Sequence, residues 1–176
     1  IREKTSPKLE LEIFIHGAMC ISYSGRCLLS NYMAERDSNR GLCAHPCRWK
    51  YYLVEEKRPG KYMPVFEDER GTYIFNSKDL MMLPHIPELV KAGIDSFKIE
   101  GRMKTSFYVA TVVKAYRQAI DAYWSNPLGY QFDKDALQEI AKVSHREFTT
   151  GFYFGKPGPT EHVYESSRYV QEYEFV

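Results

Sequence analysis

Residues 94–104 of the chain read IDSFKIEGRMK, a short apolar run followed by a cluster of charge. The run predicts a strand over about 96–99, and the segment after it repeats apolar residues at helical spacing. A strand, a polar loop and a helix form the repeating unit of parallel α/β folds, whose active residues follow the carboxyl ends of strands. The chain is therefore predicted to be α/β. Its candidate active residues include four charged side chains in or after the strand: Lys98, Glu100, Arg102 and Lys104.

Further elements are predicted on both sides of this unit. Residues 9–16 alternate apolar and polar side chains, as a half-buried strand does, and residues 84–93 form a short helix that Gly93 ends. Residues 50–57 and 62–77 read as strands around turns, the second as a hairpin with its turn near 68–71. Asp133 is a good N-cap for a helix to about Lys142. The helix after IDSFKIEGRMK should end at Asn126 and bury one stripe: Val109, Val112, Val113, Tyr116, Ile120 and Tyr123.

Composition limits the class of protein. Of the 176 residues, 44% are hydrophobic, enough for a real core, and 24 basic residues nearly balance 23 acidic ones. Net charge alone would therefore not attract the molecule to nucleic acid, so any site for a polyanion must be a local patch. No apolar run approaches the length that spans a membrane, so we expect a cytoplasmic protein without membrane contact. The chain does not begin with Met, and we treat it as a fragment of a longer protein.

Four cysteines lie within one third of the chain: Cys20, Cys27, Cys43 and Cys47. In a cytosolic protein such a group favours metal ligation over disulfides. The gaps are wider than those of most zinc knuckles, while the spacing of iron–sulfur ligands varies more between families. Two other interpretations stay open: buried cysteines that pack as small apolar groups, or a nucleophilic cysteine partnered by His16 or His45.

A longer stretch around the first pair, ELEIFIHGAMCISYSGRCLLS at 10–30, resembles the signature of the collagenase-like peptidase family of unknown catalytic type (family U, number 32). Similar blocks follow at 36–49, 66–80, 93–105 and 115–123. The later blocks look most like the branch that contains the bacterial tRNA hydroxylation proteins, which make 5-hydroxyuridine at the wobble position.

This resemblance implies a fold and a cofactor. Family members resemble a (β/α)8, TIM-like barrel followed by a small β domain. Residues 1–150 would then supply the later barrel strands and helices, with a β-hairpin insertion and a metal-binding segment at 16–50, and residues 151–176 a linker and the start of the C-terminal domain. The four cysteines would hold an iron–sulfur cluster, expected to be 4Fe-4S, with zinc as the alternative.

The resemblance also implies an enzyme whose partners are tRNA and, as a small co-substrate, prephenate, which is a dicarboxylate. Guanidinium and ammonium groups bind carboxylates and phosphates. We expect catalytic roles for Glu12, His16, Lys98, Glu100 and Arg102, and substrate binding by Arg26, Lys104 and Tyr108. His16 has a second interpretation, as a satisfied polar residue at the rim of the sheet. Four aromatic side chains are candidates to stack on bases, although most should pack in the core or against loops: Tyr23, Tyr32, Trp49 and Tyr108.

Two other functions compete with the hydroxylase. The family name implies proteolysis, but the sequence has no HExxH or GxSxG motif, and its best acidic pair is Glu12 with Glu100, each near a strand end. A non-catalytic module held by structural zinc would explain the cysteines, but it does not require the charges of EGRMK. The identity of the metal would separate these possibilities.

Overall fold

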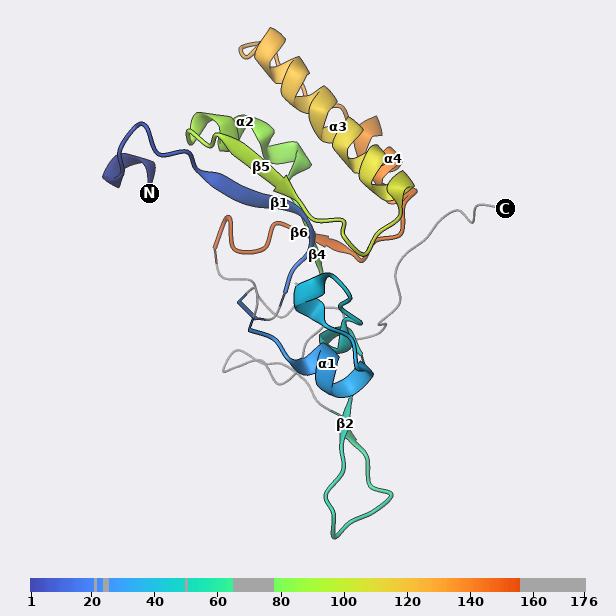
Figure 1. Cartoon of the computed structure of the whole chain (residues 1–176). Helices are drawn as coiled ribbons and strands as arrows, with labels where there is room; N and C mark the ends of the chain where they lie inside the picture. The colour runs from blue at the N-terminus through green and yellow to red at the C-terminus, as the bar shows by residue number, and fades with distance from the viewer. Residues whose placement is uncertain (21, 24–25, 50, 65–77, 156–176) are drawn as a thin grey trace. The chain divides into compact units, whose positions relative to one another are not determined.

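The computed structural model describes residues 1–20, 22–23, 26–49, 51–64 and 78–155 (Figure 1). The chain divides into two compact units. The first combines Ile1–Ala18 with Asp79–Thr150, and the second is built around Met19–Lys78. The polypeptide thus leaves the first unit after one strand and returns to it some sixty residues later.

The first unit contains a four-stranded mixed sheet in the order β5-β1-β4-β6. Its strands are β1 (Glu12–Ala18), β4 (Asp79–Met81), β5 (Ser96–Ile99) and β6 (Phe148–Thr149). β1 is parallel to β5 and antiparallel to β4, which is parallel to β6. The mixed α/β class is confirmed. A (β/α)8 barrel has only parallel strands, so the antiparallel pair departs from that pattern and the barrel stays a prediction.

Three helices complete this unit: α2 (Ile86–Lys91), α3 (Ser106–Ser125) and α4 (Asp135–Ala141). The long helix α3 packs against α2 and α4 (Figure 1). Thr105 begins it by accepting the backbone N–H of Tyr108 with its hydroxyl, a standard N-cap. The core contains these fully buried apolar side chains from β1, α2, α3, α4 and the turn after β4: Ile15, Met82, Leu83, Ile86, Val112 and Ile140.

The second unit consists of short elements. These are α1 (Leu29–Ala34), the 3-10 turns η2 (Ser38–Arg40) and η3 (Pro46–Arg48), and the two-stranded hairpin of β2 (Tyr52–Leu53) and β3 (Met63–Pro64). In the hairpin, Tyr52 pairs with Pro64 and Leu53 with Met63. A hairpin insertion is thus present, formed between the two segments predicted as strands. The separate turn predicted near 68–71 lies outside the described residues.

The predicted elements of the first unit are largely confirmed, with two corrections. The strand at 96–99, the end of α3 at Asn126 and the left-handed turn at Gly93 are as expected. In α3, Val112, Tyr116 and Tyr123 are buried as predicted and Ile120 is half-buried. Val109 and Val113 are instead exposed, and Tyr108 and Ala115 complete the buried face.

The N-terminal strand also differs from its prediction. It begins at Glu12 rather than residue 9, and both Ile15 and His16 are completely buried. Both faces of β1 are therefore buried at these two residues, whereas an alternating sequence pattern predicts that only one face is buried. Among the described residues, no helix combines the length and apolar character needed to cross a membrane.

Candidate functional site

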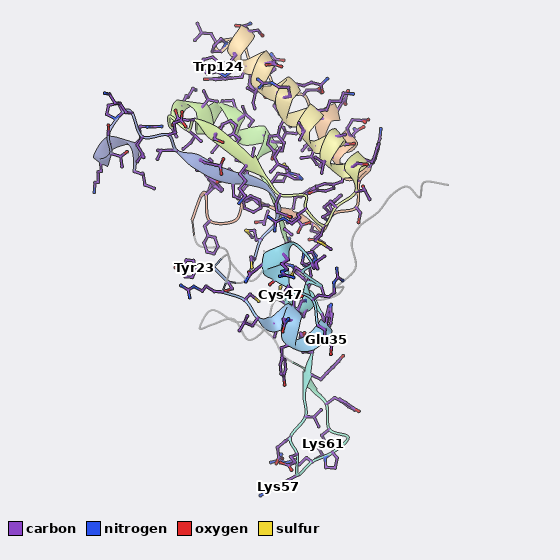
Figure 2. The ribbon with its side chains drawn as sticks, viewed as in Figure 1. Tyr23, Glu35, Cys47, Lys57, Lys61 and Trp124 are labelled. Atoms are coloured by element: carbon purple, nitrogen blue, oxygen red, sulfur yellow. The ribbon has the colours of Figure 1, made fainter. Side chains whose placement is uncertain are left out.

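All four cysteines belong to the second unit and are free thiols. Cys20 is exposed, Cys27 and Cys43 are half-buried, and Cys47 is buried in η3. Figure 2 labels Cys47. Burial therefore decreases from Cys47 to Cys20, so the group reaches from the interior of the unit to its surface.

Hydrogen bonds tie together the segments that carry the cysteines. The Arg48 guanidinium bonds the carbonyl oxygen of Met19, beside Cys20. The Ser30 hydroxyl accepts the backbone N–H of Ala44, beside Cys43, at 2.9 Å. The Ser38 hydroxyl donates to the carbonyl oxygen of Cys27 at 3.0 Å. These contacts hold distant parts of the sequence near one another without any bond between the sulfurs.

Neighbouring groups also change the acidity of the buried thiol. Burial raises the pKa of the Cys47 thiol, Arg48 opposes that effect, and the other three cysteines raise the pKa further. Backbone N–H groups of Ser22 and His45 donate to the sulfurs of Cys20 and Cys43 at 3.5 and 3.4 Å. Such hydrogen bonds stabilise a thiolate. A bound cation would remove the remaining repulsion between thiolates.

The four cysteine thiols are therefore the kind of ligands that form a four-thiolate metal centre. The side chains do not form a closed site: within the described ranges, no three His, Cys, Asp or Glu side chains converge tightly enough to hold a metal ion. The type, number and grouping of the ligands fit an iron–sulfur or zinc centre, and coordination would require the thiols to move toward one another.

A second group of polar side chains is buried in the first unit, around His16. The Tyr116 hydroxyl lies 3.3 Å from Nδ1 of His16, donates to the Ile15 carbonyl and accepts the N–H of Met82, both at 3.0 Å. A phenol has one proton, and when that proton is directed at the Ile15 carbonyl, an Nδ1–H of His16 can donate to the hydroxyl oxygen. Nε2 of His16 is then a hydrogen-bond acceptor.

His16 remains uncharged at neutral pH. Burial, followed by the charges of His145 and Lys104, lowers its pKa to about 3. The rings of Tyr108, Tyr116 and Phe148 surround it at centroid distances of 5.5 to 6.0 Å. An apolar aromatic enclosure of this kind disfavours an imidazolium ion.

His145 and Asp79 extend this buried cluster. His145 stacks on Phe148 at 4.2 Å, and its Nδ1 contacts the carbonyl oxygen of Arg146. Asp79 Oδ2 accepts the N–H of Arg146 at 3.2 Å. Within this cluster, the buried atoms Nε2 of His16, Nε2 of His145 and Oδ1 of Asp79 have no hydrogen-bond partner among the described residues. Buried polar atoms are normally paired, so these three make the cluster a candidate site.

The loop after β5 is fixed against β1 by a close backbone approach. Gly17 has φ +122°, and a Cβ there would lie 2.8 Å from the carbonyl oxygen of Glu100. The Glu100 N–H donates to the His16 carbonyl at 2.9 Å. The Glu100 side chain accepts the N–H of Arg102, also at 2.9 Å. This geometry gives Glu100 a structural part in shaping the loop EGRMK.

The other predicted site residues are dispersed. Glu12 accepts the Ser96 hydroxyl at 2.7 Å at the start of the strand pair, whereas Glu100 follows its end, so the two acids do not form a pair. Lys98, Arg102 and Arg26 are exposed, and Arg26 belongs to the second unit. Lys104 bonds the Ser144 carbonyl at 3.0 Å and lies 5.0 Å from the Tyr108 ring.

The four aromatic side chains that are candidates to stack on bases differ in their exposure. Tyr108 is only 2% exposed, which leaves little of its ring to stack on a base. Tyr23, Tyr32 and Trp49 are exposed, contrary to the expectation that most would pack in the core or against loops. Sequence reasoning placed Tyr116 in the core but missed its contact with His16, since only the fold brings the two together.

Comparison with known proteins identifies the family. The profile of Peptidase family U32 matches residues 1–163. The chain belongs to Peptidase family U32. This confirms the resemblance seen in the sequence, although no solved structure matches the chain.

Curated relatives of this U32 chain have two kinds of name. "tRNA hydroxylation protein P1" of Bacillus subtilis (strain 168) is 45% identical over 177 residues, covering all of this chain and 42% of the relative. "tRNA hydroxylation protein P" of Escherichia coli (strain K12) is 40% identical over 185 residues, covering 83% of this chain and 40% of the relative. "Collagenase" of Porphyromonas gingivalis (strain ATCC BAA-308 / W83) is 36% identical over 152 residues, covering 84% of this chain and 34% of the relative. The chain thus spans about two fifths or less of these relatives.

Proposed function

We propose that this U32 chain is part of an enzyme that modifies tRNA by hydroxylating C5 of the wobble uridine. The observation that carries the proposal is the 45% identity, along the whole chain, with a relative named a tRNA hydroxylation protein. The grouped thiols of the second unit could hold the redox centre that such an enzyme needs.

In this proposal, Cys20, Cys27, Cys43 and Cys47 hold an iron–sulfur cluster, which would supply electron transfer for the insertion of oxygen. Around it, the Arg48 guanidinium offsets negative charge near Cys47, and the amides of Ser22 and His45 support two of the thiolates. These contacts support thiolate ligation by either iron or zinc.

We further propose that the exposed cations Lys98 and Arg102 bind anionic groups, either prephenate carboxylates or tRNA phosphates. Glu100 sets their loop through its bond to the N–H of Arg102. The whole protein would act in the cytoplasm, where tRNA is available, and would complete the sheet of this chain into a (β/α)8 barrel.

Nucleoside analysis tests the function. A strain that lacks the gene is complemented with the whole protein, and its tRNA is digested and analysed by mass spectrometry. We expect 5-hydroxyuridine and its derivatives to be missing in the deletion strain and restored by the wild type. Nucleosides that are identical in both strains would exclude the hydroxylase.

Proteolysis is the second candidate, because the family is named for peptidases and one relative is named Collagenase. The same purified protein should then cleave gelatin or collagen peptides. Cleavage that survives Cys20→Ser, without any change in tRNA, would favour the peptidase. A zinc content without iron or sulfide would instead favour the structural module.

A further inference from the structure

The positive charge of this chain is concentrated in one segment. Residues 19–64 contain eight Lys and Arg against four Asp and Glu, whereas the whole chain is nearly balanced at 24 against 23. The same segment forms the described core of the second unit. Arg48 is buried, and Arg40 and Arg58 pair with Asp37 and Glu55, so the exposed cations of this segment without a described ion pair include Lys57 and Lys61. A nearly neutral protein needs such local positive charge in order to bind a polyanion.

The β2–β3 hairpin carries two exposed aromatic rings on one face. Tyr52 pairs with Pro64 across the hairpin, and Tyr62 lies two residues before Pro64, so both tyrosines point to the same side. Tyr52 is 56% exposed and Tyr62 is 68% exposed. Exposed tyrosines at adjacent cross-strand positions are unusual for a surface that faces only water.

The geometry of these rings leaves room for a stacked base. Their centroids are 6.0 Å apart and their planes are inclined by 80°. In such an edge-to-face pair, the ring that presents its edge keeps both of its own faces uncovered by its partner. A nucleobase can therefore stack on it without breaking the pair.

Cations lie at the tip of the same hairpin. Lys57 and Lys61 are exposed there, as Figure 2 shows. Arg58 forms an ion pair with Glu55 at 2.8 Å, and Glu56 also lies at the tip. The net charge of the hairpin is therefore small. The two tyrosine rings would bind a base of a nucleic acid, and the two lysines would contact its phosphates.

We propose that the β2–β3 hairpin binds single-stranded RNA, with Tyr52 and Tyr62 stacking on unpaired bases and Lys57 and Lys61 contacting phosphates. Aromatic stacking beside basic groups is the general way in which proteins bind unpaired nucleotides. This inference rests on the proposed function, in which tRNA is the substrate, and it assigns the contact with an unpaired loop to a defined element. An acidic protein partner would need the cations but not the ring faces.

The test measures binding of a fluorescein-labelled anticodon stem–loop RNA to the whole protein by fluorescence anisotropy at several salt concentrations. Tyr52→Ala and Tyr62→Ala should each weaken binding about tenfold, and Tyr62→Phe should bind like the wild type because it keeps the ring. Lys57→Ala with Lys61→Ala should lower the log–log salt slope by about 1.4, or about 0.7 for each phosphate that is no longer neutralised. The control, Lys114→Ala on the exposed side of α3 in the first unit, should change neither quantity.

Each contrary result has a distinct meaning. Tyrosine variants that bind like the wild type, or a loss of affinity confined to the lysine variants, would overturn the stacking proposal while leaving tRNA hydroxylation intact. An equal loss of affinity for a fully paired RNA duplex would also overturn it. If the wild type neither binds the stem–loop nor restores 5-hydroxyuridine, the proposed function fails and this inference fails with it.

Discussion

His16 and Tyr116 lie 100 residues apart in the sequence and meet in the core of the first unit. The Tyr116 hydroxyl also bonds the Ile15 carbonyl and the Met82 N–H, two groups that bond each other at 3.0 Å, so one phenol ties α3 to β1 and to the residue that follows β4. Since unpaired buried polar groups are costly, this residue links the stability of the unit to the placement of His16.

Tyr116→Phe should therefore destabilise the protein although the ring is kept. The change removes the hydroxyl from Nδ1 of His16, whereas the Met82 N–H keeps its bond to the Ile15 carbonyl, so we expect a cost of about 1–2 kcal/mol in the free energy of unfolding. Urea denaturation followed by far-UV circular dichroism measures it. Tyr123→Phe, another buried tyrosine of α3 whose ring packs on Tyr130, is the matched control and should cost less. Equal destabilisation of the two variants would show that the hydroxyl bridge is unimportant.

The low pKa of His16 makes stability depend on pH. The unfolded chain takes up a proton near pH 6.5, whereas the folded protein resists protonation until about pH 3. The contribution is thus complete above pH 6.5 and is lost as the pH falls toward 3. Over this window the wild type should lose up to about 5 kcal/mol more than the non-titrating variant His16→Gln. Unfolding free energies measured at several pH values would contradict the assignment if the two curves ran parallel.

At the level of elements, the contact between β1 and the loop after β5 depends on Gly17. An alanine there would adopt a left-handed conformation and place its Cβ against the Glu100 backbone. Gly93, also with positive φ, offers a comparison in the same unit, because a Cβ there would meet the side chain of Arg2 at 3.3 Å rather than backbone.

Gly17→Ala should accordingly destabilise the unit by more than Gly93→Ala. Both variants carry the cost of a left-handed alanine, about 1 kcal/mol, and only Gly17→Ala adds a steric clash with backbone. Thermal melts of the two variants, followed by circular dichroism, give the comparison. Similar midpoints would mean that the Glu100 loop shifts freely and is not fixed by β1.

Elements with strong local signals could be predicted from the sequence. The strand at 96–99 and the helix from Ser106 to Ser125 follow from periodicity and capping, and Asp133 does accept the N–H of Asp135 at the start of α4. The depth of burial at His16 could not be predicted, because its cover comes from Tyr108, Tyr116 and Phe148, far along the chain. The antiparallel pairing of β1 with β4 likewise depends on contacts across the sixty-residue excursion.

Across the whole chain, candidate chemistry is divided between the two units. The cysteines and the β2–β3 hairpin belong to the second, whereas the His16 cluster and the loop EGRMK belong to the first. The cysteines could be predicted as a group because all four lie close together in the sequence. It did not predict the Tyr52–Tyr62 pair, because the register of the hairpin decides which tyrosines share a face.

The central claim is that the four cysteines hold an iron–sulfur centre needed for tRNA hydroxylation. Cys20→Ser tests it most cleanly, because Cys20 is exposed and its replacement removes little packing, in contrast to the buried Cys47. The matched control is Ser22→Ala, which changes a neighbouring side chain and keeps all four thiols.

The measurement is the iron and acid-labile sulfide content of the whole protein, purified without oxygen, in the wild type and both variants. We predict iron and sulfide in the wild type and in Ser22→Ala, and the loss of both in Cys20→Ser with little change in the thermal midpoint. Iron and sulfide that remain unchanged in Cys20→Ser, or a wild type that contains only zinc, would contradict the account.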